Sequence, residues 1–170
     1  MNNIYLVGMP GCGKTTISSI IIKNLNIEIV DLDEHIVSRE GKTIEELFEI
    51  GEPHFRQVET DALKDLSHRE GILVATGGGV VTRDENIDIM RATGKVIFID
   101  ASPSFIMDKS SLSGRPLLKD KNKLYELYNN RIALYRKSAD YTVLNDGILS
   151  KVCQRTEEVI RQIIKGRSQN

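Results

Sequence analysis

The stretch Gly8–Thr15, with the sequence Gly-Met-Pro-Gly-Cys-Gly-Lys-Thr, limits the possible folds of this chain more than any other. It follows the apolar run Ile4–Val7 and leads into the segment Thr16–Leu25, whose apolar residues recur at helical spacing. The pattern G-x-x-x-x-G-K-[ST] is typical of a loop that wraps a phosphate in backbone N–H groups at the positive end of a helix. We therefore predict a site for a nucleoside triphosphate.

The residues of this loop have separate predicted tasks. The Lys14 ammonium can reach the β- and γ-phosphates, and the Thr15 hydroxyl can ligate a magnesium ion that keeps most of its waters. The other candidates for nucleotide binding in this stretch are Gly11, Cys12, Gly13 and Thr16. The alternative is a glycine-rich turn with a solvated lysine, which the complete motif between a strand and a helix disfavours.

Length and composition are those of one globular domain. The chain has 170 residues, of which 40% are hydrophobic and 28% charged, and no proline-rich, serine-rich or single-sign stretch divides it. We expect a single domain over residues 1–170. The formal net charge of -1 argues against a nucleic-acid partner. The N-terminus lacks the features of a signal peptide, so we expect a cytoplasmic monomer with no membrane partner.

Cysteines and histidines indicate neither a disulfide nor a zinc site. Cys12 lies in the phosphate loop, and Cys153 lies in a late helical segment where it suits a small core position. The three histidines have no cysteine partners and no H-E-x-x-H pattern.

Short apolar runs alternate with longer helical patterns, which is typical of βαβ units and a parallel sheet. Most of these runs do not alternate, as expected of strands that are buried on both faces. The expected fold class is therefore α/β, with helices on both faces of the sheet in three layers. The predicted strands are Ile4–Gly8, Glu28–Leu32, Ile72–Thr76, Lys95–Asp100 and Tyr141–Asn145.

Capping signals predict where several helices begin and end. Thr43 and Glu46 form a capping box for a short helix that ends at Gly51, and Thr82 with Glu85 forms a second box. Further helices are expected over 33–40, from Pro53, from Pro103, through Leu124–Tyr135, and from Ser150 to Lys165 with a stop at Gly166.

Polar residues and glycines follow the carboxyl ends of the predicted strands, where open parallel sheets bind ligands. Asp31 is suited to hold a magnesium-bound water, and Asp33 to accept a hydrogen bond and a proton from an acceptor hydroxyl. An N-cap role is the alternative for each aspartate. Gly77–Gly79 permits close approach of the backbone and exposes N–H groups.

Three arginines are candidates for binding anionic groups. Arg56 and Arg131 lie on amphipathic helical segments, and together with a Gly-Gly edge they would form a carboxylate receptor. The alternative is that they are ordinary exposed helix arginines. Arg115 lies in a small, polar stretch that predicts a mobile loop, from which it could stabilise charge on a transferring phosphoryl group.

Taken together, these residues resemble the shikimate kinase family over essentially the whole chain. The motifs that carry the resemblance are the phosphate loop, Asp31-Leu32-Asp33, Phe55-Arg56 with Glu59, Gly77-Gly78-Gly79, Arg115-Pro116-Leu117, and Arg131 with Tyr135. The resemblance implies a nucleoside-monophosphate-kinase-like P-loop kinase fold with strand order 2-3-1-4-5. It also implies a lid at about 109–119, a substrate-binding helical region at about 33–61, and ATP-dependent phosphorylation of the 3-hydroxyl of shikimate in aromatic amino-acid biosynthesis.

The resemblance further implies a role for each site residue. Asp33 would bind the substrate hydroxyls, and Arg115 would be the lid arginine. Lys14, Thr15 and Asp31 keep their nucleotide and magnesium roles. The carboxylate of shikimate would be bound by Arg56, Arg131 and the Gly77–Gly79 stretch, with Glu59 orienting Arg56 and with Phe48 and Phe55 near the substrate ring. Where many members carry an arginine at the start of the lid, this chain has Asp108 and Lys109, and lysine cannot replace guanidinium stacking on adenine.

Other classes of protein fit the motifs less well. A gluconate kinase would share the phosphate loop and the lid arginine but would not need a carboxylate receptor arranged as Arg56, Gly79 and Arg131. A nucleotide-dependent regulatory module is the non-catalytic alternative, although the GTPase motifs D-x-x-G and N-K-x-D are missing from their expected places. A dinucleotide-binding dehydrogenase would need glycine where Thr16 stands.

Overall fold

The computed structural model describes residues 3–110 and 120–167, without the side chains of residues 109, 110 and 167. Its strands are β1 (Asn3–Val7), β2 (Glu28–Asp31), β3 (Ile72–Ala75), β4 (Gly94–Asp100) and β5 (Tyr141–Leu144). Its α-helices are α1 (Lys14–Ile21), α2 (Leu32–Glu40), α3 (Ile44–Ile50), α4 (Glu52–Ser67), α5 (Asp84–Thr93), α6 (Pro103–Ser110), α7 (Lys121–Ser138) and α8 (Leu149–Arg167). Two short 3₁₀ helices, η1 (Ile22–Asn24) and η2 (Val80–Thr82), complete the described part of the chain.

The strands form one parallel sheet in the order β2-β3-β1-β4-β5. This confirms the strand order that the family resemblance implied, and the predicted strands agree with the observed ones to within one residue at each end. The central strands β1 and β3 are wholly buried, as their non-alternating sequences predict. The edge strands β2 and β5 are partly exposed, because each has a neighbour on one side only.

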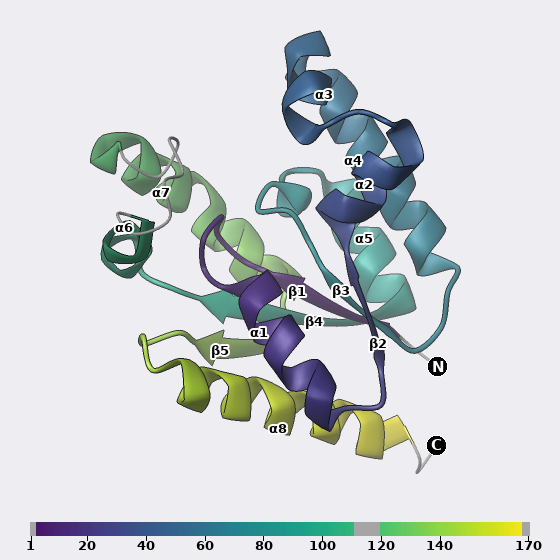
Figure 1. Cartoon of the computed structure of the whole chain (residues 1–170), viewed down its shortest axis with the longest axis vertical. Helices are drawn as coiled ribbons and strands as arrows, with labels where there is room; N and C mark the ends of the chain where they lie inside the picture. Colours follow the sequence, from purple (N-terminus) through teal and green to yellow (C-terminus); the bar gives the residue numbers. More distant parts are fainter. Residues whose placement is uncertain (1–2, 111–119, 168–170) are drawn as a thin grey trace.

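Helices cover the sheet in layers. Helix α1 packs against α8, and in Figure 1 α1 lies in front of the sheet while α8 runs below β5. Helix α5 contacts β1 and β4. Helix α4 packs against α2, α3 and α5, and this group of helices occupies the upper right of Figure 1. The three-layer α/β fold predicted from the sequence is thereby confirmed. Among the helices of the described ranges, none is both long enough and apolar enough to cross a membrane.

Local signals correctly predict several helix ends. Thr43 Oγ1 accepts from Glu46 N at 3.2 Å, and Glu46 Oε2 accepts from Thr43 N at 2.7 Å, so this capping box is complete. Helix α3 ends at Gly51, whose φ of 144° suits glycine, and Pro53 lies in the first turn of α4 as predicted. These residues orient α4, which carries Arg56 and Glu59.

The second predicted capping box is wrong. Helix α5 begins at Asp84 with Arg83 as its N-cap residue and has no side-chain cap. Thr82 Oγ1 instead donates to the Gly79 carbonyl at 2.7 Å, and Glu85 pairs with Lys64 at 2.6 Å. Other partners, the nearby Gly79 carbonyl and Lys64 of α4, therefore occupy both side chains that the local pattern assigned to the cap.

Two other boundaries differ from the prediction. The first helix does not run from Thr16 to Leu25: it begins at Lys14, inside the phosphate loop, and gives way to η1 after Ile21. The last helix does not stop at Gly166, since α8 extends to Arg167. Helix ends depend on hydrogen bonds that apolar spacing does not report.

Candidate functional site

The phosphate loop between β1 and α1 has positive φ angles, which residues other than glycine rarely adopt. Gly8, Gly11 and Gly13 have φ values of 151°, 79° and 101°. A Cβ on Gly8 would also lie 2.6 Å from the Ile99 carbonyl oxygen of β4. The backbone conformation therefore favours glycine at all three positions, and the close approach to β4 adds a steric requirement at Gly8.

The Lys14 side chain is folded into this loop. Its ammonium donates to the carbonyl oxygens of Gly8 at 2.8 Å and Met9 at 3.1 Å, and only 8% of the residue is exposed. The positive charge thus lies among the backbone groups of the loop, next to the N-terminus of α1. This position suits an anion such as a phosphate, which would share the ammonium with the two carbonyls.

Asp31 links the phosphate loop to α2. One carboxylate oxygen accepts from Asp33 N at 3.0 Å and Glu34 N at 3.3 Å and so caps α2, while the other accepts from Thr15 Oγ1 at 2.9 Å. The N-cap of α2 is therefore Asp31, and the capping alternative for Asp33 is wrong.

A hydroxyl and a carboxylate are thus adjacent at the open end of the loop. These hard oxygen donors fit magnesium, which takes one or two protein oxygens and completes its shell with waters and phosphates. The described part of the chain contains no group of three or more His, Cys, Asp or Glu side chains that could hold a metal. A sparse Thr15–Asp31 set therefore fits an ion that arrives with a nucleotide.

A buried ion pair lies on the inner face of α4. Arg56 Nη1 donates to Glu59 Oε2 at 2.8 Å, and Glu59 is fully buried. Burial raises the pKa of Glu59 because the carboxylate loses its hydration, Arg56 opposes that rise, and the Asp33 charge adds to it. Glu59 Oε1 is buried and has no hydrogen-bond partner among the described residues.

Two stacked aromatic rings lie beside the Arg56 guanidinium. Phe48 and Phe55 stack with centroids 4.2 Å apart, and the Arg56 Cζ lies 5.7 Å and 5.1 Å from the two centroids. Phe55 is buried, whereas Phe48 is 40% exposed. Glu52 also contacts Arg56, at 3.2 Å. The guanidinium is therefore held in one orientation by carboxylates and rings together.

The glycine loop after β3 contacts the other parts of the site. A Cβ on Gly77 would lie 3.0 Å from Glu59 Oε1 and 3.1 Å from Asp33 Oδ1, and one on Gly79 would overlap the Arg56 guanidinium. A Cβ on Gly78 would lie 2.5 Å from Cδ of Pro10, in the phosphate loop. The three glycines thus allow α2, α4 and the phosphate loop to meet.

Helix α7 contributes Arg131 and Tyr135 to the same place. The Gly78 carbonyl accepts from the Tyr135 hydroxyl at 2.5 Å and from Arg131 Nη1 at 3.2 Å. Burial raises the pKa of Tyr135, so the phenol stays protonated and remains a donor. The Gly78 carbonyl therefore fixes both of these α7 side chains at the glycine loop.

The structure therefore brings together most of the residues predicted from the sequence. Those gathered around the glycine loop are Asp33, Arg56, Glu59, Gly77, Gly78, Gly79 and Arg131, with Phe48 and Phe55 beside Arg56. Gly11, Cys12, Gly13, Lys14, Thr15 and Thr16 form the neighbouring phosphate loop and the start of α1, and Asp31 borders it. Arg115, most of the predicted lid and the Lys109 side chain lie outside the described residues.

Arg83 is a supporting residue that the sequence analysis did not single out. Its Nη1 donates to the Arg56 carbonyl at 3.0 Å, to Thr60 Oγ1 at 2.9 Å and to Gln57 Oε1 at 3.1 Å. Arg83 thereby ties the segment after the glycine loop to the turn of α4 that carries Arg56. No sequence signal indicated this, because Arg83 lay inside the pattern that was interpreted as a capping box.

Two features of the arrangement define its chemistry. The phosphate loop offers backbone N–H groups, an ammonium and a helix N-terminus to a polyphosphate. Beside it, the guanidinium groups of Arg56 and Arg131 and the Asp33 carboxylate lie around the glycine loop. This set can bind an anionic molecule that also carries a hydroxyl, next to a nucleotide.

The comparisons with known proteins agree with this chemistry. The family model for shikimate kinase matches residues 10–166. A shikimate kinase of Clostridium botulinum (strain Alaska E43 / Type E3) is 40% identical over 160 residues, which are 94% of this chain and 97% of that protein. One of Clostridium beijerinckii is also 40% identical over 160 residues, 94% of this chain and 95% of the relative.

Solved structures give the same result. The shikimate kinase of Acinetobacter baumannii in complex with shikimate superposes with a TM-score of 0.85 at 34% identity, covering 95% of this chain and 94% of that one. The shikimate kinase of Aquifex aeolicus has a TM-score of 0.81 at 33% identity, with 98% of both chains covered. The fold and the sequence thus point to one family over nearly the full length.

Replacing Glu59 by glutamine tests whether its buried carboxyl lowers stability at neutral pH. Because the folded-state pKa is raised, the stabilising contribution of Glu59 is complete below the ordinary glutamate pKa of 4.5 and is lost as the pH rises through the folded-state value. We expect the unfolding free energy of Glu59→Gln, relative to the unchanged protein, to increase between about pH 4 and about pH 7. Urea unfolding followed by circular dichroism measures this difference.

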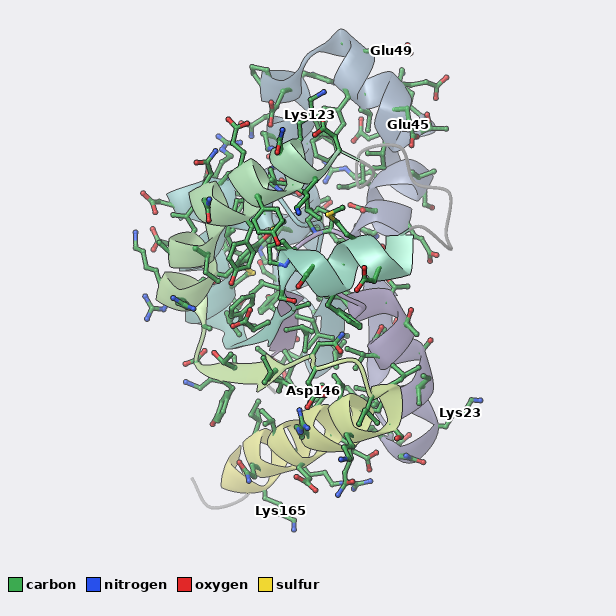
Figure 2. The ribbon with its side chains drawn as sticks, turned by 90° about the vertical axis from the view of Figure 1, so that its left-hand side faces the viewer. Lys23, Glu45, Glu49, Lys123, Asp146 and Lys165 are labelled. Atoms are coloured by element: carbon green, nitrogen blue, oxygen red, sulfur yellow. The ribbon has the colours of Figure 1, made fainter. Side chains whose placement is uncertain are left out.

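Glu49→Gln is the matched control for this experiment. Glu49 lies on α3, and Figure 2 shows it at the end of the molecule that α3 forms. The Glu49 carboxylate is exposed, so the unfolding free energy of Glu49→Gln relative to the unchanged protein should change less with pH. Equal pH dependence for the two variants would contradict the effect of burial at Glu59.

Proposed function

The chain belongs to the shikimate kinase family, and we propose that it transfers the γ-phosphoryl group of ATP to the 3-hydroxyl of shikimate, with Mg²⁺ as cofactor. The products are shikimate 3-phosphate and ADP, in the pathway to chorismate and the aromatic amino acids. The observation that carries the proposal is the meeting of Asp33, Arg56 and Arg131 around one glycine loop beside the phosphate loop. Shikimate is a carboxylate with ring hydroxyls, and this set matches both groups.

The carboxylate of shikimate would bind between Arg56, Arg131 and the N–H groups of the glycine loop. Arg56 is oriented by Glu59 at 2.8 Å, and the Gly78 carbonyl anchors Arg131 through one nitrogen, which leaves its other nitrogen to donate. Two fixed guanidinium groups bind a planar carboxylate better than mobile ones, since less side-chain entropy is lost. Phe48 and Phe55 would bound the ring on the side of Arg56.

The transfer step would join the 3-hydroxyl oxygen to the γ-phosphorus as the bond from that phosphorus to the β,γ-bridging oxygen breaks. Asp33 would hold the hydroxyl in line and take its proton, and ADP would leave with the electron pair of the broken bond. Lys14, in the loop, would stabilise the charge on the β- and γ-phosphates. Magnesium, held by Thr15 and through water by Asp31, would supply further neutralisation of the phosphates.

The remaining nucleotide contacts follow from the loop and the lid. Backbone N–H groups of Gly11, Gly13, Lys14, Thr15 and Thr16 would surround the phosphates. The Cys12 N–H instead donates to the Met9 carbonyl at 3.1 Å. Arg115 would reach the transferring group from the lid at about 109–119. We also propose that residues 1–170 form one domain, and that the protein is a cytoplasmic monomer.

The first experiment is a coupled ADP-release assay with ATP and magnesium on shikimate, on gluconate and without an acceptor. We expect turnover with shikimate alone, because only shikimate pairs a ring carboxylate with a hydroxyl at the spacing of this site. Turnover with gluconate alone would overturn the substrate and the carboxylate site but not the kinase fold. No acceptor-dependent turnover, with ATP still bound, would favour a regulatory module.

Asp33→Asn tests the aspartate that would orient the hydroxyl and take its proton. The amide keeps the shape but cannot accept a proton, so turnover should fall by about 100-fold or more, with ADP affinity within about twofold. Asp88→Asn, at an exposed position of α5, makes the same change outside the site and should not alter turnover. Unchanged turnover in Asp33→Asn would remove Asp33 from the mechanism.

Arg131→Ala tests the carboxylate site. Losing charge-assisted hydrogen bonds to the substrate should raise the KM for shikimate by about 10- to 100-fold and change the KM for ATP by less than about threefold. Arg136→Ala is the control, because Arg136 is exposed on the same helix. Steady-state kinetics with each substrate varied in turn would show the difference, and an unchanged shikimate KM would exclude Arg131 from the site.

A further inference from the structure

Asn145 is a buried polar residue at the end of β5 to which the proposed reaction gives no role. It follows Leu144, the last residue of the strand, and only 5% of it is exposed. Its backbone N–H donates to the Asp100 carbonyl at the end of β4 at 2.7 Å, so its main chain is part of the sheet edge. Asp146, labelled in Figure 2, comes next and marks the turn that leads into α8.

The Asn145 side chain reaches the phosphate loop. Its Nδ2 donates to the Cys12 carbonyl at 2.8 Å, and its Oδ1 accepts from the Gly147 N–H at 3.2 Å. Because Oδ1 is held by a donor, the group that faces the Cys12 carbonyl must be the NH₂. Hydrogen bonds at both Nδ2 and Oδ1 therefore fix the orientation of the Asn145 amide.

This contact sets the orientation of one peptide group in the loop. The Cys12 carbonyl and the Gly13 N–H belong to the same planar trans peptide, in which they point in opposite directions. A carbonyl drawn toward β5 by Asn145 therefore turns the Gly13 N–H away from β5. Gly13 has a φ of 101°, at the start of α1, and glycine rotates more easily than any other residue.

We propose that Asn145 is a positioning residue for nucleotide binding: by holding the Cys12 carbonyl, it directs the Gly13 N–H toward the phosphates. Without this hold, the peptide between Cys12 and Gly13 turns more freely, and a donor to the nucleotide is lost for part of the time. The inference rests on the proposed nucleotide role of the loop, and it adds a residue 133 positions away in the sequence that prepares the loop for its ligand.

Two substitutions of Asn145 separate the effect of its hydrogen-bond donor from the effect of its side-chain volume. Asn145→Ala removes the donor, and Asn145→Asp keeps the shape but places a carboxylate oxygen against the Cys12 carbonyl oxygen, so that the two repel. We expect the Kd for ADP to rise by about fivefold in the alanine variant and by tenfold or more in the aspartate variant, given the free energy of one hydrogen bond. The Kd for shikimate should stay within about twofold, because Asn145 has no described contact with the glycine loop.

Asn26→Asp makes the same chemical change at an exposed position before β2, at the opposite end of the strands, and should leave both Kd values as they are. Titration calorimetry measures the affinities, and the amide resonance of ¹⁵N-labelled Gly13 reports the peptide itself. Without ADP, we expect this resonance to have a different chemical shift in the Asn145 variants than in the unchanged protein. On addition of ADP, its shift should change less in the variants. Thermal unfolding shows that each variant is folded.

Unchanged ADP affinity in both Asn145 variants would overturn the proposal, and so would an equal loss of ADP and shikimate affinity, which indicates general loosening. A larger effect in the alanine variant than in the aspartate variant would also contradict it. If Asn145→Asp does not fold, the alanine variant and the Gly13 resonance still decide. These measurements need no turnover, so a failure of the unchanged protein to phosphorylate shikimate would overturn the proposed function without bearing on them.

Discussion

The buried pair of Glu59 and Arg56 is the interaction on which the acceptor side of the site depends. A carboxylate without water must be paired, and its partner guanidinium is thereby fixed 2.8 Å away, beside two stacked aromatic rings and against Gly79. The second carboxylate oxygen lies close to Gly77 and near Asp33. The desolvated Glu59 therefore fixes the Arg56 guanidinium close to the Asp33 carboxylate, and these are two groups that a bound substrate would contact.

The acceptor and nucleotide sides of the site are joined by direct contact. Gly78 lies against Pro10 of the phosphate loop, and its carbonyl accepts from Tyr135, whose hydroxyl also lies 3.9 Å from the sulfur of Met9. In-line transfer requires the reacting oxygen and the phosphorus to be held at a set distance. The close contact between Gly78 and Pro10 fixes the distance between the acceptor side and the nucleotide side of the site.

The local capping patterns were correct where the two capping residues bind each other and wrong where other groups bind them. The Thr43 and Glu46 capping box formed because both of its hydrogen bonds lie within one turn. The corresponding box at Thr82 did not form, since the Gly79 carbonyl and Lys64 bind its two side chains. Asp33 has the pattern of a helix cap, but Asp31 takes that place and leaves Asp33 facing the glycine loop.

The sequence by itself determined the five strands, the phosphate loop with its positive-φ glycines and most of the site residues, because these depend on apolar spacing and on backbone rules that act locally. The strand order, the identity of the substrate and the roles of Glu59, Phe48 and Phe55 came from family resemblance. Only the tertiary structure decided that Arg83 supports α4, that Tyr135 and Arg131 hold the Gly78 carbonyl, and that Asn145 holds that of Cys12. Each of these bonds joins residues more than 20 positions apart, and a hydrogen bond at that separation exists only once the sheet has brought its two ends together.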